Sequence, residues 1–261
     1  MIPKIIHYCW LSDEPIPMNL QKCMNSWKRF MPDWHIIRWS TKNFDIHSVP
    51  LVEQAYNAKK YAFAADYIRI YALNKMGGIY LDSDVMLYGS IEPLLTADFI
   101  SAVEYHPSYE ELSRNKELRI IGQDGKRIGK GMKVYGIGIQ AALLASIPHH
   151  PLLNKILNFY EHITLTEILT KRLTAPTIIA FHCEFYGFIY KDIEQTLNAS
   201  IKLYPTKIIG NYDQKCKNSI AIHQCAGSWT NKTIKSRITK FLNAYPAYKK
   251  IIFLLKSIFK R

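Results

Sequence analysis

The sequence predicts one α/β domain followed by a basic C-terminal segment. Helix and strand patterns alternate along most of the 261 residues, and 48% of the residues are hydrophobic, which is enough for one substantial core. The first forty residues already show a strand pattern, a helix pattern and a second strand pattern. We therefore predict a single domain over residues 1–229 and a separate tail over residues 230–261.

The first three elements predict the start of a βαβ unit. Residues 2–10 form a short apolar segment rich in β-formers, which indicates a buried strand. Residues 19–30 have apolar side chains at helical spacing, and residues 34–39 (WHIIRW) predict the next strand. We expect His7, on the first strand, to be a hydrogen-bonded core residue and not a ligand.

The middle of the chain predicts a helix that leads directly into a strand. Residues 52–76 have a helical pattern with a break near Lys59 and Lys60, and Gly77-Gly78 ends it. Residues 79–81 then form an apolar strand that runs into Asp82-Ser83-Asp84. Residues 99–104 predict another strand, and the polar, glycine-rich residues 107–133 predict an excursion with a small hairpin.

The last third of the domain predicts helices followed by short strands. Residues 140–146 and 152–162 are expected to be helical, separated by Pro148 and Pro151. Residues 177–187 predict a further helix. Residues 202–204 and 220–224 predict late strands.

The basic charge is concentrated in the tail. The chain has 34 Lys and Arg against 21 Asp and Glu, a net charge of +13. Residues 230–261 have no acidic residue and contain nine basic ones, Lys232, Lys235, Arg237, Lys240, Lys249, Lys250, Lys256, Lys260 and Arg261. Apolar residues alternate with these lysines, which predicts a basic amphipathic segment on an anionic membrane, or a docked helix with a solvated basic face. A nucleic-acid groove across the domain is disfavoured.

The cysteines and the N-terminus give expectations about the compartment. The five cysteines have no C-x-x-C spacing, which disfavours a zinc knuckle and a disulfide framework. No signal-peptide pattern begins the chain, and no apolar run reaches the roughly 18–20 residues of a membrane span. We expect a cytoplasmic protein attached peripherally to the inner face of the cell membrane.

Two pairs of charged residues are the candidate chemical groups. Asp82 and Asp84 follow an apolar strand, at the end of the strand where open α/β sheets bind ligands. Two carboxylates there suit Mg²⁺ or Mn²⁺, which would neutralise a departing diphosphate, although a solvated turn is the alternative. Asp66 and Arg69 share a helix face, either as a simple ion pair or as contacts for sugar hydroxyls and phosphate.

Ordered motifs along residues 1–229 resemble glycosyltransferase family 32, the DXD-containing family of capsule-type sugar transferases and α-mannosyltransferases that is distantly similar to the glucosylating toxins. The resemblance is carried by IPKIIHYCW at 2–10, Trp27, Pro32, Trp39, AKKYAFAADYIR at 58–69, GGIYLDSDV at 77–85 and HQCAGSW at 223–229. It implies a GT-A fold and a retaining reaction.

The resemblance also implies roles for individual residues. Trp10 would pack near the nucleobase, Asp66 and Arg69 would contact the donor sugar, and Tyr80 belongs to the same donor-binding set. Asp82 would lie near the ribose or the sugar, Asp84 would bind the metal, and His223 would lie near it. Ser228 and Trp229 would close over the diphosphate. Family members often have an acidic residue before the Ser-Trp pair, where this chain has Ala226-Gly227.

We therefore expect a retaining, metal-dependent hexosyltransferase that uses Mn²⁺ or Mg²⁺ and a nucleotide sugar, with UDP favoured by the resemblance. The expected acceptor is a glycan, lipid-linked, in surface polysaccharide synthesis. Two alternatives stay open, a phosphotransferase of the haloacid dehalogenase type and a non-catalytic basic nucleic-acid-binding module. The first shares the strand-D-x-D pattern but needs a downstream acidic pair, and the later aspartates of this chain are isolated.

Overall fold

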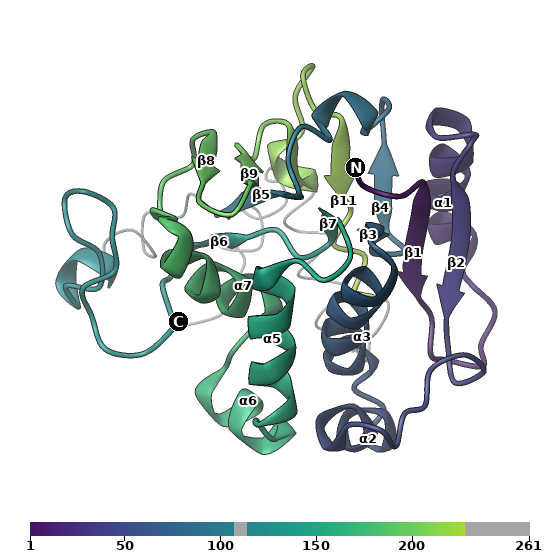
Figure 1. Ribbon diagram of the computed structural model, residues 1–261, viewed down its shortest axis with the longest axis horizontal. Coiled ribbons are helices and arrows are strands. Elements are labelled where there is room, and N and C mark those ends of the chain that lie inside the picture. Colours follow the sequence, from purple (N-terminus) through teal and green to yellow (C-terminus); the bar gives the residue numbers. More distant parts are fainter. Residues whose placement is uncertain (107–113, 228–261) are drawn as a thin grey trace, which may run out of the picture. The chain divides into compact units, whose positions relative to one another are not determined.

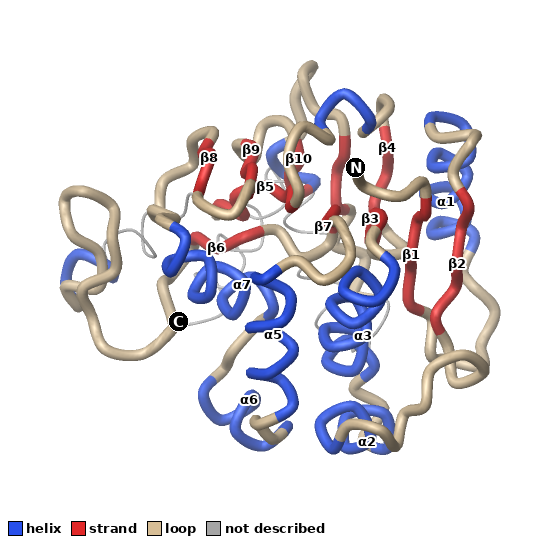
Figure 2. Tube along the Cα trace, in the orientation of Figure 1, coloured by secondary structure: helices blue, strands red, loops and turns tan. Residues whose placement is uncertain are grey.

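The large sheet at the centre of the fold is made of strands from the whole length of the chain. The structure is a computed structural model that describes residues 1–106 and 114–227 (Figures 1 and 2). The strands of this sheet are β1 (Ile5–Cys9), β2 (His35–Trp39), β3 (Gly78–Leu81), β5 (Phe99–Tyr105), β6 (Ile137–Ile139), β7 (Leu143–Ser146), β8 (Gln195–Leu197) and β9 (Ile201–Tyr204). Their order is β2-β1-β3-β7-β5-β9-β8, and β6 pairs with β5.

A second, three-stranded sheet has the order β10-β11-β4. It consists of β4 (Val85–Leu87), β10 (Ile209–Asn211) and β11 (Ala221–His223). Strand β11 is parallel to β10 and antiparallel to β4, and its last residue, His223, pairs with Val85. The end of the described chain therefore lies beside the segment that follows Asp84.

The N-terminal half confirms the predicted α/β class. Strand β1 pairs in parallel with both β2 and β3. Helix α1 (Met18–Phe30) connects β1 to β2, and α2 (Pro50–Asn57) and α3 (Tyr61–Met76) connect β2 to β3. The predicted break near Lys59 is confirmed, since Lys59 has a positive φ of 54° between the two helices.

Two apolar cores cover the two faces of the large sheet. Successive side chains of a strand point to opposite faces, so Tyr80 belongs to one core while Ile79 and Leu81 belong to the other. The first core packs against α2, α3, α5 (Pro151–Glu161), α6 (Leu165–Lys171) and α7 (Ala175–Cys183). The second core includes Trp27 of α1 and residues of the small sheet. Figure 1 shows α3 and α5 side by side, with α2 and α6 next to them.

Two glycines allow the chain to turn from α3 into β3. Gly77 has φ +65° and ends the helix with its N–H donated to the Leu73 carbonyl, as the sequence predicts. Gly78 has φ +103°, and a Cβ there would lie 2.5 Å from the Ile5 carbonyl oxygen. Only glycine therefore lets β3 lie this close to β1, which fixes where the residues after β3 emerge.

One predicted element is wrong in type. Residues 140–146 were expected to be helical, but β7 occupies most of this run, paired with β3 and touching β5. All four residues of β7 are buried, so the run is apolar throughout, and hydrophobic periodicity cannot separate such a strand from a buried helix. Strands β4, β6, β8 and β10 and helix α6 were not expected from the sequence.

Smaller features agree with the sequence where the structure describes them. Within 114–133, Ile121 bridges Arg127 in antiparallel fashion, which confirms the expected hairpin. His7 is fully buried and hydrogen-bonded to the Gly77 carbonyl and Trp39 Nε1, so it is a satisfied core residue. Short 3-10 turns follow at Glu92–Leu94, Glu184–Tyr186 and Tyr212–Gln214.

Residues Met1–Ala226 form one compact unit. Among the described residues, no helix is both long enough and apolar enough to cross a membrane. The predicted tail, 230–261, lies outside the described residues, and the boundary at residue 229 stays a prediction.

Candidate active site

A tight turn joins the large sheet to the small one and contains the D-x-D residues. Asp82 N–H donates to the Ala142 carbonyl next to β7, and Val85 N–H donates back to the Asp82 carbonyl. The chain thus leaves β3, turns within three residues and enters β4. Asp82 and Asp84 lie at this junction, at the C-terminal end of β3, where ligands of open α/β sheets bind.

Asp84 is held from two sides by the end of β11 and the residues after it. Its Oδ1 lies 3.2 Å from His223 Nε2, and its Oδ2 accepts the Ala226 N–H at 2.7 Å. Burial alone would raise the pKa of Asp84, but the bonds from His223 and Ala226 lower it overall. Burial alone would lower the pKa of His223, but its hydrogen bonds to Asp84 and Cys225 raise it well above 6.5.

Asp82, Asp84 and His223 are arranged as a set of metal ligands. One ligand atom from each of the three lies within 4.8 Å of the others. The 3.2 Å between Asp84 Oδ1 and His223 Nε2 is close to the separation of about 3 Å expected for adjacent ligands at roughly 2.1 Å from a divalent cation. The two carboxylates suit Mn²⁺ and Mg²⁺, and the imidazole favours Mn²⁺ of the two, so the residues present fit the expected ion.

Arg69 joins helix α3 to the D-x-D turn. Its Nη2 lies 2.8 Å from Asp66 Oδ1 and 3.4 Å from Asp82 Oδ1. Its Nη1 donates to the Ala141 carbonyl at 2.7 Å, and the guanidinium lies 4.9 Å from the centre of the Tyr80 ring. The i,i+3 ion pair expected from the sequence therefore exists, but it is one part of a network that also holds Asp82.

Burial governs the charges in this network. The side chains of Arg69 and Asp66 are 6% and 15% exposed. Burial raises the pKa of Asp66 to about 6, although Arg69 acts in the opposite direction. Burial alone would lower the pKa of Arg69, but Asp82, Tyr80 and Asp66 raise it above its ordinary value. Arg69 therefore stays charged and compensates the two carboxylates.

Tyr80 contacts this cluster, whereas Trp10 has its described bonds elsewhere. Tyr80 is 1% exposed and its hydroxyl donates to Asp82 Oδ1 at 3.1 Å, so its link to the site runs through Asp82 and Arg69. Trp10 directly follows β1, is half-buried, and donates its indole N–H to the Glu14 carbonyl. Its expected contact with a nucleobase stays a prediction. Ser228 and Trp229 lie outside the described residues.

Sequence reasoning missed two buried polar residues near the site, Gln140 and Tyr160. Gln140 is 2% exposed, donates to Asn211 Oδ1 and accepts the Ala142 N–H, and Asn211 pairs with His223 in the small sheet. Gln140 therefore holds the end of β10, which pairs with the strand that carries His223. A polar residue inside the apolar run 137–146 was the available signal, because buried amides are retained only with partners. Tyr160, whose pKa is raised by burial and further by Asp66, gave no such signal.

Comparison with known proteins gives the chemical class. Residues 17–100, which include α3 and the D-x-D turn, match the family described as "Glycosyltransferase sugar-binding region containing DXD motif". The chain is a glycosyltransferase, and its residues 17–100 are similar to this DXD-containing family. The class decides against the two alternatives, a phosphotransferase and a non-catalytic module.

Curated relatives of this glycosyltransferase come from Schizosaccharomyces pombe. Inositol phosphoceramide mannosyltransferase 1 is 25% identical over 100% of this chain and 75% of its own length. Inositol phosphoceramide mannosyltransferase 3 is 36% identical over 36% of this chain and 27% of its own length. The similarity to the first therefore extends well beyond the D-x-D region.

The fold of the glycosyltransferase is of the GT-A type. The structure of mouse xyloside xylosyltransferase 1 has a TM-score of 0.50 to this chain, covers 85% of this chain and 97% of its own, and is 10% identical. At this level of identity the similarity concerns the fold alone. The GT-A fold expected from the resemblance is confirmed.

Proposed function

We propose that this glycosyltransferase is a retaining, metal-dependent hexosyltransferase that uses a nucleoside-diphosphate sugar. The observation that carries the proposal is the convergence of Asp82, Asp84 and His223 at one junction, next to the buried Arg69–Asp66 pair. The first three offer ligands to a cation, and the pair lies beside them, where a sugar linked to the diphosphate would be bound.

In this proposal Asp84 and His223 hold Mn²⁺ or Mg²⁺, with Asp82 as a nearby ligand. When bound, the ion supplies positive charge that stabilises the diphosphate as it leaves. Ala226 N–H keeps Asp84 oriented, and Arg69 keeps Asp82 and Asp66 in place. Asp66 accepts hydrogen bonds from sugar hydroxyls through the carboxylate oxygen that Arg69 leaves available.

The chemical step breaks the bond between the anomeric carbon and the diphosphate oxygen, which keeps the electron pair. The acceptor hydroxyl attacks the anomeric carbon from the same face, and its proton passes to the departing diphosphate. The product then retains the anomeric configuration of the donor. Retention rests on the family resemblance.

The donor is a hexose nucleotide, and the relatives, which are named as mannosyltransferases, support a hexose. The resemblance favours UDP as the carrier. The acceptor is lipid-linked, which the phosphoceramide in the relatives' names supports, and its product is a surface polysaccharide or glycolipid. The direct test is transfer of labelled hexose from UDP- and GDP-sugars to an inositol phospholipid or to a lipid-linked glycan.

The assay tests the metal dependence, the stereochemistry and the role of Asp84. We expect transfer that needs Mn²⁺ or Mg²⁺, stops on chelation and gives the retained anomer by NMR. Asp84→Asn should lower the rate about 100-fold or more, because it removes a charged ligand of the ion. Asp33→Asn, which changes an exposed aspartate, is the matched control. Transfer that survives chelation, or an inverted product, would refute the proposed mechanism.

We further propose that the protein acts at the inner, anionic face of the cell membrane, attached through residues 230–261, and that it does not bind nucleic acid. The support is the nine basic residues of this segment and its lack of acidic ones. Cosedimentation should be strong with anionic vesicles and weak with neutral ones, and truncation after Trp229 should abolish it. Full retention of vesicle binding after truncation, or salt-resistant binding to duplex DNA, would overturn this part.

A further inference from the structure

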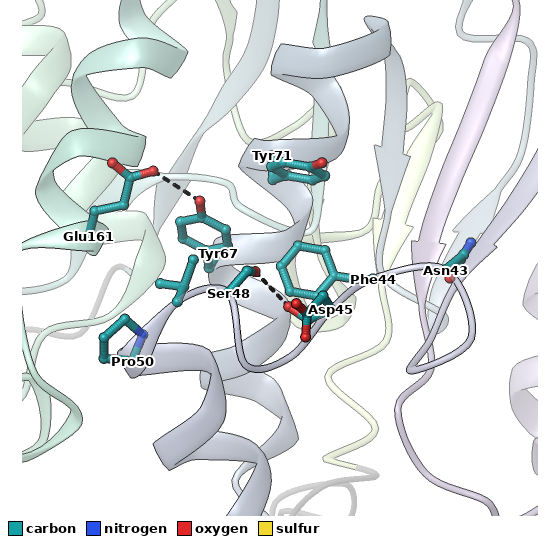
Figure 3. A pocket seen from close by; sticks show the side chains of 9 residues that line it. Asn43, Phe44, Asp45, Ser48, Pro50, Tyr67, Tyr71 and Glu161 are labelled. Carbon is teal, nitrogen blue, oxygen red and sulfur yellow. Dashed lines mark hydrogen bonds between the residues drawn. The ribbon is translucent and has the colours of Figure 1, made fainter.

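A cavity of about 460 Å³ lies on the side of α3 that faces away from the D-x-D turn (Figure 3). It is lined by loop residues after β2, the start of α2, the middle of α3 and the end of α5. Tyr67 and Tyr71 line it from α3. Asp66 and Arg69 belong to the same helix but to another face of it. With 3.6 residues per turn, the two tyrosines are rotated by at least about 100° from Asp66 and Arg69. The cavity is thus separate from the candidate active site.

The inner wall of the cavity is aromatic. Phe44 is buried and makes edge contacts with Tyr67 and Tyr71, at ring-centre distances of 6.1 Å and 5.2 Å. Tyr71 is half-buried and lines the cavity. Figure 3 shows these three rings together, with Glu161 on one side and Asp45 on the other.

The rim of the cavity is polar and negatively charged. Glu161 accepts the Tyr67 hydroxyl at 3.0 Å, and Asp45 accepts the His47 N–H at 3.0 Å. Each of these bonds uses one carboxylate oxygen. In the part of the chain that the structure describes, neither carboxylate forms an ion pair, and both side chains are exposed. Phosphates, nucleotides and anionic head groups are therefore unsuited to this cavity.

Two ligand classes suit carboxylates beside aromatic rings, namely cations and neutral polyols. A cation would bind over an aromatic face. At Tyr71 a positive charge is already close, because Lys75 Nζ lies 5.5 Å from the ring centre and donates to the Tyr71 hydroxyl. This nearby positive charge opposes a second cation. The hydroxyls of a polyol can instead donate to Glu161 and Asp45, in strong charge-assisted hydrogen bonds, while its C–H surface packs on the rings.

We propose that this cavity binds a neutral saccharide unit, as a second contact site for the acceptor glycan. Its volume falls within the roughly 300–1,000 Å³ typical of small-molecule sites. The identity of the saccharide as acceptor rests on the proposed function, but binding itself requires neither donor nor metal. A site of this kind raises the local affinity for a longer glycan without taking part in the chemical step.

The test is saturation-transfer NMR on the full-length protein in a chelating buffer, with lactose, maltose and mannobiose, and with tetramethylammonium as the cation probe. Wild type and Asp84→Asn should both give saccharide signals. Glu161→Gln, which keeps an acceptor for the Tyr67 hydroxyl, should weaken binding about 10-fold, and Tyr71→Ala should abolish it. Glu117→Gln, at an exposed carboxylate elsewhere, should leave binding unchanged.

Kinetics separate this proposal from the proposed function. Glu161→Gln should raise the KM for a glycan acceptor about 10-fold, while hydrolysis of the sugar nucleotide without acceptor stays at the wild-type rate. Failure of nucleotide and metal binding would refute the proposed function and leave the saccharide signals intact. The saccharide site would be overturned if only tetramethylammonium gave a signal, or if no saccharide gave one. It would also be overturned if Asp84→Asn removed the saccharide signals and Glu161→Gln did not.

Discussion

The guanidinium of Arg69 lies 3.4 Å from the carboxylate of Asp82, so that helix α3 and the turn after β3 share one buried cation. The same guanidinium pairs with Asp66 at 2.8 Å. One positive charge therefore compensates two carboxylates in a poorly solvated site. Any ligand that changes the charge near Asp82 therefore also changes how far Arg69 compensates the charge of Asp66.

Loss of this cation should destabilise the fold. Arg69→Met leaves the largely buried Asp66 and the half-buried Asp82 without compensation, and we expect it to lower the free energy of unfolding by about 3–5 kcal/mol. The double variant with Asp66→Asn should lose less than the sum of the two single variants, because one of the orphaned charges is gone. Urea denaturation of the four proteins measures the coupling. Additive losses would show that Arg69 and Asp66 do not interact energetically.

His7 should make stability depend on pH. Trp39 Nε1 donates to His7 Nδ1, so the neutral ring carries its proton on Nε2 and donates to the Gly77 carbonyl. Burial lowers the pKa of His7 below 6.5 in the folded protein. As the pH falls through 6.5 the unfolded chain therefore takes up a proton that the folded chain does not, and the folded state loses stability by at most about 1.4 kcal/mol per pH unit from this group.

Thermal unfolding of wild type and His7→Gln between pH 7.5 and 5.5 checks this dependence. The variant should be less stable at pH 7.5 but should lose less stability on acidification. Part of the dependence should remain, because burial also lowers the pKa of His150 and His182. His162→Gln, at an exposed histidine, is the control. An unchanged pH dependence in His7→Gln would contradict the assignment.

The buried hydroxyl of Tyr160 should lower the free energy of unfolding. Tyr160 is 1% exposed, and its hydroxyl has no hydrogen-bond partner among the residues that the structure describes. A buried polar group without a partner is unfavourable, so Tyr160→Phe should raise the free energy of unfolding by about 1 kcal/mol. The ring contact with Tyr67, at 6.3 Å between centres, is kept. A stability loss in urea denaturation would instead indicate a buried water bound to the hydroxyl.

The fold could be predicted from local signals wherever those signals were unambiguous. Gly77-Gly78 marked the end of α3 because both positions need a positive φ, and the apolar strand after them placed Asp82 correctly. The strand β7 was missed because its buried residues carry no periodicity. The short strands β4, β8 and β10 have three residues each and depend on pairing with distant segments, which local sequence does not show.

The site could be predicted only in part for the same reason. Asp66 and Arg69 are three residues apart, so their pairing follows from helix geometry. The contact of Arg69 with Ala141, and the proximity of His223 to Asp84, depend on how remote strands pair. His223 entered the prediction through a resemblance between motifs. Gln140 was missed because its partner, Asn211, belongs to a strand that the sequence did not predict.

Asp84 should hold a divalent cation that carries a nucleoside diphosphate. A thermal-shift panel with UDP, GDP and CMP, with and without Mn²⁺, on wild type and Asp84→Asn, measures this binding, since a ligand of the folded state raises the unfolding midpoint. We predict a Mn²⁺-dependent shift with one nucleoside diphosphate that the variant loses. No shift with any of the nucleotides, or the same Mn²⁺-dependent shift in Asp84→Asn, would contradict the claim.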